Sequence, residues 1–444
     1  MSKNKSLKKF IILFLVIGTI LINIPLNPKV KINQKSTLNL KTSSTSYCLE
    51  WEDIWGGSSA EYGRGGIAID NNGSIYITGD TYSFGSGGYD IYIIKYDTNG
   101  NKIWTRFWGT STHETAHDIA LDSSGDIYVT GHIGESGYSM LLLKYDSNGN
   151  YQWHSIWGQA TWDEGYGVIV DEFGNIYVTG RTMDNFVLWK FDSIGGLIWS
   201  KINTSLQGGL VIGKDESGFI YTSGTDGNNV YLSKYYPNGT IIWNRCWGGE
   251  DTEWVHDIAV DNSSNIYLAG GTYSYGAGEI DTYIIKYNCT GTKLWNTIWG
   301  TPYNEMCFGI ALDDLGNIFL TGYIFLPGET NKTDHKRDTF IAKFDCNGTL
   351  VWLDTWGGLE YDDGYGIALD MNGSIYVTGS TNSFGAGDSD IFILKYSSCK
   401  TQIPPNLIGF SIIELSWFIV IFLFGIMCFL LKKKRIRIVS VKNL

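Results

Sequence analysis

Residues 356–396 read WGGLEYDDGYGIALDMNGSIYVTGSTNSFGAGDSDIFILKY, and a unit of this form occurs seven times between residues 51 and 398 of the 444-residue chain. In the first unit, a Trp-x-x-x-Trp-Gly segment precedes an acidic loop and short β-rich segments at residues 66–70, 74–79 and 93–97. Self-similarity at such a period is the signature of a repeat architecture. Each unit therefore predicts four strands, and seven units predict seven blades.

Two charged residues mark equivalent positions in all seven units. An aspartate closes the second segment of each unit at Asp70, Asp122, Asp171, Asp215, Asp261, Asp313 and Asp370. A lysine stands in the last segment at Lys95, Lys144, Lys190, Lys234, Lys286, Lys343 and Lys395. Because every unit repeats them, we expect these residues to form ion pairs within a blade or to bind a turn.

The local composition favours strands over helices. β-branched and aromatic residues dominate the segments, and Asn-Gly pairs such as Asn99-Gly100 separate them as hairpin turns do. A four-stranded sheet cannot bury both faces alone, so neighbouring sheets must stack, and closing the stack into a ring removes exposed edges. The expected fold is therefore all-β, a seven-bladed β-propeller of four-stranded blades over residues 48–399.

The unit at residues 356–396 resembles the SBBP-type β-propeller repeat family, and the resemblance covers residues 51 to about 398. It implies a propeller, usually on secreted or surface proteins, but no single activity. The fourth unit departs from the pattern, because Asn203 replaces the second tryptophan and the loop before Asp215 is irregular.

Two cysteines indicate how the ring closes. If residues 66–70 form an innermost strand, as in similar propellers, the chain begins with an outermost strand at Trp51 and ends on a third strand at Tyr396. Cys48 and Cys399 then stand where other units have a hairpin turn, so we expect a disulfide between them, the alternative being two unrelated thiols. The pairing of Cys246, Cys289, Cys307 and Cys346 stays open.

The two ends of the chain predict export and anchoring. Residues 1–26, a lysine cluster followed by an apolar run, read as a signal peptide or a signal anchor, and residues 27–47 as a polar linker. After a linker at 400–406, residues 407–431 predict a transmembrane helix, and the basic residues 432–444 predict a cytoplasmic tail. We expect a single-pass membrane protein with an extracellular propeller, whose hairpin turns face the membrane and whose long loops face outward.

Charge and glycosylation motifs agree with this location. The net charge of −12 argues against a nucleic-acid partner, which needs a basic face. Candidate N-glycosylation sites with the Asn-x-Ser/Thr motif are Asn72, Asn203, Asn238, Asn262, Asn288, Asn331, Asn347 and Asn372.

An acidic position six residues after the second tryptophan is the main candidate for ligand binding. It holds Glu61, Glu114, Asp163, Glu253, Glu305 and Asp362 in six of the seven units. A ring of carboxylates near the channel mouth could hold Ca²⁺ or a basic or hydroxyl-rich ligand. The alternative is that each carboxylate binds backbone N–H groups of its own loop, as repeated residues usually serve the repeat.

Two other motifs favour structural roles. His113-Glu114-Thr115-Ala116-His117 matches the zinc-protease pattern H-E-x-x-H, but that motif requires a helix and this segment lies between predicted strands. Tryptophan pairs such as Trp104 and Trp108 lie on one face of a strand and are expected to pack between blades. We therefore expect no catalytic residues, no resident metal and no required cofactor.

The sequence thus favours a non-catalytic binding or adhesion module for a protein or glycan, acting through its outward loops. The loops at residues 82–89, 273–280, 382–389 and 323–337 break the symmetry of the repeats, although plain connectors would have the same composition. Two alternatives remain: an extracellular polysaccharide hydrolase or lyase using the acidic positions, and a structural protein of the cell envelope.

Overall fold

The computed structural model describes residues 46–399 except 136, 159–161, 207–208 and 326–335. These residues form 29 strands and no helix, in agreement with the all-β expectation. No described segment has the helical length and hydropathy needed to cross a bilayer. The predicted signal segment at 1–26 and the predicted transmembrane helix at 407–431 lie outside the described residues.

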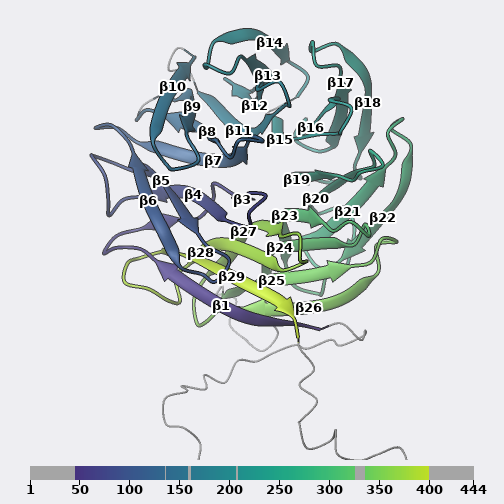
Figure 1. Ribbon diagram of the computed structural model, residues 1–444. Helices are drawn as coiled ribbons and strands as arrows, with labels where there is room; N and C mark the ends of the chain where they lie inside the picture. The colour runs from purple at the N-terminus through teal and green to yellow at the C-terminus, as the bar shows by residue number, and fades with distance from the viewer. Residues whose placement is uncertain (1–45, 136, 159–161, 207–208, 326–335, 400–444) are drawn as a thin grey trace, which may run out of the picture. The chain divides into compact units, whose positions relative to one another are not determined.

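The strands form seven antiparallel sheets, each of which is one blade (Figure 1). The innermost strands are β2 (Glu61–Tyr62) with β3 (Ile67–Ile69), β7 (Glu114–Leu121), β11 (Asp163–Val170), β15 (Gly209–Lys214), β19 (Glu253–Val260), β23 (Glu305–Leu312) and β27 (Asp362–Leu369). The second strands are β4 (Ile75–Thr81), β8 (Ile127–Ile133), β12 (Ile176–Thr182), β16 (Ile220–Thr225), β20 (Ile266–Thr272), β24 (Ile318–Phe325) and β28 (Ile375–Thr381).

The third and outermost strands complete each sheet. The third strands are β5 (Asp90–Tyr96), β9 (Ser139–Tyr145), β13 (Asn185–Phe191), β17 (Val230–Tyr235), β21 (Asp281–Tyr287), β25 (Arg337–Phe344) and β29 (Asp390–Ser398). The outermost strands are β6 (Lys102–Trp108), β10 (Tyr151–Trp157), β14 (Leu197–Asn203), β18 (Ile241–Trp247), β22 (Lys293–Trp299), β26 (Leu350–Trp356) and β1 (Tyr47–Trp55). We number the blades 1 to 7 from the sheet that contains β4 to the sheet that contains β28.

The hydrophobic core lies between blades rather than within them. At the boundary of blades 1 and 2, for example, Ile91 and Ile93 of β5 pack with Val129 of β8 and Leu141 of β9, all at most 1% exposed. A cluster of this kind lies at each of the seven boundaries, including that between blades 7 and 1. Each blade therefore depends on both neighbours to bury its two faces.

Outer-strand tryptophans pack against the hairpin turn of the next blade. A Cβ atom added to Gly100, which has a φ of +84°, would lie 2.8 Å from the ring of Trp51. The same close approach joins Gly149 to Trp104 at 2.9 Å. Only glycine combines this backbone conformation with so close a ring, which explains the recurrent Asn-Gly turn and confirms that the tryptophans pack between blades.

The repeated aspartate and lysine stabilise the hairpin after each innermost strand. Asp70 accepts the N–H groups of Asn72 at 2.9 Å and Ser74 at 2.8 Å, and the hydroxyl of Tyr76 at 3.1 Å. Lys95 lies 3.9 Å from the Asp70 carboxylate and 4.7 Å from the centre of the Tyr76 ring. The aspartates therefore bind their own turns, as expected. The repeated lysine lies within 4.0 Å of the repeated aspartate in blades 1, 4, 5 and 6, whereas Lys144 pairs with Asp126 and Lys395 with Glu50.

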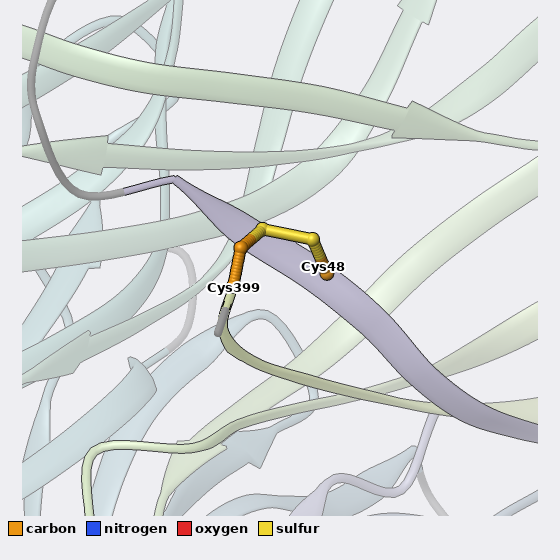
Figure 2. Close-up of a disulfide and its surroundings, with 2 residues drawn as sticks. All are labelled: Cys48 and Cys399. Carbon is orange, nitrogen blue, oxygen red and sulfur yellow. A yellow bond between two sulfur atoms is a disulfide. The ribbon is translucent and has the colours of Figure 1, made fainter. Parts of the chain in front are cut away.

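The first strand completes the last blade. Strand β1 pairs antiparallel with β29, with Trp51 opposite Lys395 and Trp55 opposite Ile391. The Cys48–Cys399 disulfide joins the two strands across a sequence separation of 351 residues, with their Cα atoms 5.2 Å apart (Figure 2). This confirms the predicted closure, whereas Cys246, Cys289, Cys307 and Cys346 are unpaired thiols.

The connections define two faces of the ring. The turn face carries two tight hairpins in each of blades 1 to 6, such as residues 70–74 and 97–101 in blade 1, and one hairpin and the disulfide in blade 7. The long-loop face carries the loops from second to third strands and the loops between blades, such as residues 82–89 and 109–113. Of the predicted glycosylation sites, Asn203 ends β14 and Asn331 lies outside the described residues. The six in turn-face hairpins are Asn72, Asn238, Asn262, Asn288, Asn347 and Asn372.

We predict that Cys48→Ser lowers the free energy of unfolding by about 2–5 kcal/mol, because the disulfide restricts the unfolded chain over a very long loop. Urea unfolding of the purified full chain followed by tryptophan fluorescence measures this change. Cys246→Ser, which removes an exposed free thiol, is the matched control and should leave the transition unchanged. Equal midpoints for Cys48→Ser and the parent chain would contradict the role of the disulfide.

Candidate ligand-binding site

Each innermost strand carries an irregularity at the same place. Six of these strands are interrupted by a β-bulge at one residue, which is His117, Tyr166, Leu210, His256, Phe308 or Tyr365. In blade 1, Arg64 lies in the gap between β2 and β3. A bulge leaves one residue out of the ladder and turns its side chain away from the regular alternation of the strand. We call Arg64, His117, Tyr166, His256, Phe308 and Tyr365 the bulge residues.

All six bulge residues line one central pocket with a volume of about 530 Å³. Its remaining lining comes from the residues that follow them in the innermost strands, among them Ile67, Val211, Ile310 and Ile367. Because these strands run from the long-loop face to the turn face, the bulge residues surround the pocket on its long-loop side. The pocket is therefore polar and aromatic near this face and apolar deeper in the ring.

Arg64 is the arginine of the pocket lining and carries a formal positive charge. Its guanidinium is exposed and lies 4.5 Å from the ring centre of Tyr62 and 6.0 Å from that of Tyr365. The nearby Asp80 is buried, and burial raises the pKa of its carboxyl group to about 7, with the N–H of Ala116 and the charge of Arg64 opposing the rise. Arg64 thus lies against two aromatic rings at the wall of the pocket.

Two other carboxylates in the pocket wall join neighbouring blades. Asp118 accepts the N–H groups of Ile119 and, from blade 3, of Val168, both at 2.8 Å. Asp257 in the same way accepts the N–H of Ile310 at 2.8 Å. Burial raises the pKa of both carboxyl groups to about 7. Their oxygens bind backbone N–H groups of the scaffold, so these carboxyl groups have a structural role in the pocket wall.

A polar network lies on the long-loop side of blades 2 and 3. His117 Nε2 lies 3.2 Å from His132 Nδ1, and Glu164 accepts hydrogen bonds from the Tyr166 hydroxyl and from Arg181 Nη2, the latter at 2.8 Å. Burial lowers the pKa of His117 to about 3 and also lowers that of His132. Although burial opposes it, these two hydrogen bonds hold the pKa of Glu164 below its usual value. The network therefore contains two neutral imidazoles and one ionised carboxylate.

The opposite side of the pocket has different chemistry. In blade 5, His256 is half-buried and packs against Phe308 of blade 6 at 4.9 Å between ring centres. Further round, Arg337 Nη2 donates to Asp363 Oδ2 at 2.6 Å and stacks over Tyr323 at 4.2 Å. The pocket is therefore asymmetric although the blades that form it are repeats.

Exposed aromatic side chains are also spread over the loops of the long-loop face. Their exposed fractions range from 37% to 52%, and they are Tyr82, Phe84, Trp162, Tyr273, Tyr275, Tyr303 and Tyr361. Two of the symmetry-breaking loops, at residues 82–89 and 273–280, contribute four of them. Tyrosine and tryptophan on a rigid scaffold supply large contact areas together with a hydrogen-bonding group.

The six acidic positions do not come together in this pocket. Glu61, Glu114, Asp163, Glu253, Glu305 and Asp362 are at most 3% exposed, and each begins or precedes the innermost strand of its own blade. Glu61 accepts the N–H of Gly57 at 2.8 Å, and Glu253 accepts the N–H of Gly249 at 3.2 Å and the hydroxyl of Thr272 at 3.1 Å. These contacts are those of carboxylates that stabilise their own interblade loops, and neither a Ca²⁺ site nor a ligand contact is needed to explain them.

We predict that Glu253→Ala lowers the free energy of unfolding by roughly 1–3 kcal/mol, because it leaves the buried hydroxyl of Thr272 without its acceptor and removes the bond to the N–H of Gly249. Thermal unfolding of the full chain provides the measurement. Glu250, an exposed residue of the same loop, is the matched control, and Glu250→Ala should have no effect. If the two variants unfold at the same temperature, Glu253 does not stabilise the loop.

The H-E-x-x-H segment lies on a strand, not a helix. Glu114 begins β7 and is buried, while His113 precedes the strand and accepts the N–H of Tyr89 at 3.0 Å. His117 instead lines the central pocket. The motif therefore lacks the helical face on which the zinc-protease arrangement depends.

The bulge residues were not identified as candidates from the sequence. A signal was present, because the third residue after the acidic position varies between units while its flanking positions repeat, and it is aromatic or basic at Arg64, His117, Tyr166, His256, Phe308 and Tyr365. Without the structure, this position would be assigned to a regular strand. Side chains of a regular strand alternate between the two faces of the sheet, and this pattern does not predict a side chain that points to the ring centre.

Comparisons with known sequences support the repeat assignment. A model of the SBBP β-propeller repeat matches residues 152–186 and 356–385, and a model of a β-propeller domain of unknown function, DUF5122, matches residues 71–102. An uncharacterized WD repeat-containing protein of Acanthamoeba polyphaga mimivirus is 28% identical over 156 residues, covering 28% of this chain and 11% of that protein. The regulatory protein FlaEY of Caulobacter vibrioides is 27% identical over 114 residues, covering 24% and 12%. The chain thus spans little more than a tenth of each relative.

Solved structures show the same fold at low sequence identity. The WD40 domain of Pan2 from Neurospora crassa gives a TM-score of 0.52 at 10% identity, covering 80% of this chain and 97% of that chain. A chain of the mitotic checkpoint complex gives 0.54 at 12% identity, covering 84% and 96%. Virginiamycin B lyase from Staphylococcus aureus gives 0.51 at 11% identity, covering 79% and 99%. At such identities the likeness concerns the fold alone.

Proposed function

The chain is a seven-bladed β-propeller with SBBP-type repeats, and from this premise we propose that it is a non-catalytic binding module for an extracellular protein or glycan. Its binding surface is the long-loop face around the central pocket. The observation that carries this proposal is the convergence of six different bulge side chains on one pocket. Residues that are the same in every blade stabilise the scaffold. Residues that differ between blades at an equivalent position can instead bind a specific ligand.

The pocket chemistry favours an anionic or hydroxyl-rich group on the partner. Arg64 offers a guanidinium that pairs well with a carboxylate, and Tyr166 and Tyr365 offer hydroxyl groups in a partly apolar setting. The aromatic residues of the surrounding loops extend the contact area beyond the pocket. Such a surface, with a buried anchor point and an aromatic rim, suits recognition of a larger molecule through one inserted group.

The two alternatives gain less support from the geometry. A polysaccharide hydrolase or lyase based on the acidic positions would need accessible carboxylates, but these side chains are buried and bind their own loops. A purely structural envelope protein would need no specific ligand and no asymmetric pocket. Binding measurements separate it from the module proposed.

The proposed location follows from the chain ends. Strand β29 ends at the turn face, next to the Cys48–Cys399 disulfide, and the apolar segment at 407–431 follows shortly after. If that segment anchors the chain in the membrane, the turn face lies toward the bilayer and the long-loop face points outward. The propeller is then presented on the cell surface with its pocket accessible.

We predict that the purified chain binds a defined set of glycans or envelope proteins on an array, and that Tyr82→Ser and Tyr273→Ser each weaken this binding about tenfold. A tenfold loss corresponds to about 1.4 kcal/mol, the scale of one aromatic contact in an interface. Arg64→Gln should reduce binding further if the partner presents a carboxylate. Surface plasmon resonance on the array hits gives the dissociation constants.

Phe173→Ser is the matched control, since Phe173 is an aromatic residue 80% exposed on a turn-face hairpin. It should leave the dissociation constants unchanged. An equal loss for Phe173→Ser would place the binding surface elsewhere, and an array without hits would favour the structural alternative.

A further inference from the structure

One cluster of potential metal ligands lies beside the central pocket. It consists of His117 on β7, His132 on β8 and Glu164 on β11, and one ligand atom of each residue lies within 4.8 Å of the others. Among the described residues it is the one group of three histidine, cysteine or acidic side chains with this geometry. Glu164 is 4% exposed, and the two histidines are largely buried.

The repeat supplies an internal test of whether the fold requires this cluster. Blade 5 has a histidine at the same bulge, His256, but Gly271 stands in the register position of His132 and Met306 in that of Glu164. Blade 5 folds with the same strands and the same bulge. The three polar residues therefore meet beside blades 2 and 3 for a reason other than the stability of the repeat.

We propose that His117, His132 and Glu164 bind a divalent transition-metal ion, with Zn²⁺ as the expected ion. Two imidazoles and one carboxylate are a common ligand set for zinc and for other first-row metals.

The surrounding residues fit the role of a second shell. The Tyr166 hydroxyl and Arg181 each bind one oxygen of Glu164, which leaves lone pairs on both oxygens for a metal. Tyr138 packs on the His132 ring at 4.2 Å between centres and fixes its orientation. Hydrogen-bonded carboxylates and oriented imidazoles are typical of metal sites. Because Arg181 offsets the charge of Glu164, we expect a moderate affinity.

Three protein ligands leave at least one coordination position for another group. His117 is also a bulge residue that lines the central pocket, so a carboxylate or hydroxyl group placed there lies near the ion. The metal would then act as an additional contact for a ligand. The proposed metal site itself does not depend on the binding function proposed above.

The test is a titration of the chelator-treated full chain with Zn²⁺ and with Co²⁺. Exposed thiols are first alkylated, because Cys246, Cys289 and Cys346 offer competing sites. We expect one equivalent of Zn²⁺ by isothermal titration calorimetry, a visible Co²⁺ absorption band, and a higher unfolding temperature with Zn²⁺. His117→Gln, His132→Gln and Glu164→Gln should each weaken binding at least tenfold.

The matched control is His256→Gln, which changes the histidine at the same bulge of blade 5 and should leave the affinity unchanged. Circular dichroism checks that each variant is folded, and the three ligand variants test the same site independently. No stoichiometric binding by the alkylated parent chain would overturn the proposal. So would binding that survives in the His117→Gln/His132→Gln double variant, or an equal loss in His256→Gln.

Discussion

The structure depends on closing the ring. A blade has two apolar faces, and each boundary cluster is complete only when both neighbouring blades are present, so an open row of seven sheets would leave two faces exposed. The chain solves this by giving its first strand to its last blade, where β1 pairs with β29. The Cys48–Cys399 bond then fixes a contact between segments 351 residues apart, whose loss opens the whole ring.

Within this ring, the repeated residues and the varying residues have separate roles. Asp70 and its counterparts bind hairpin turns, and the buried acidic residues such as Glu253 hold the interblade loops. The site, by contrast, is formed by residues that differ between blades, such as Arg64, His117 and Tyr365. A propeller can therefore change its ligand without changing its scaffold, because both sets occupy the same strands but face different surroundings.

The β-bulge is the feature that connects scaffold and site. In a regular strand, side chains alternate between the two interblade surfaces, and none is aimed at the centre of the ring. The bulge between Ala116 and Asp118 leaves His117 unpaired in the ladder and brings it to the pocket, within reach of His132 and, from blade 3, Glu164. The same distortion brings Tyr166, His256, Phe308 and Tyr365 to the pocket, so one backbone feature accounts for most of its polar and aromatic lining.

The sequence by itself determined the repeat, the number of blades, the strand types and the closing disulfide, because these follow from local periodicity and from counting strands. It also identified Asp70 and Trp104 as parts of the scaffold, since recurrence in every unit implies a role in every unit. The sequence did not show which of two nearby residues belongs to the pocket. Glu61 repeats between units but is buried, whereas Arg64, three residues later, lines the pocket. Only the tertiary structure distinguished the two residues. Long-range packing decides where a side chain at a bulge points and which residues of different blades meet, and local sequence does not encode that packing.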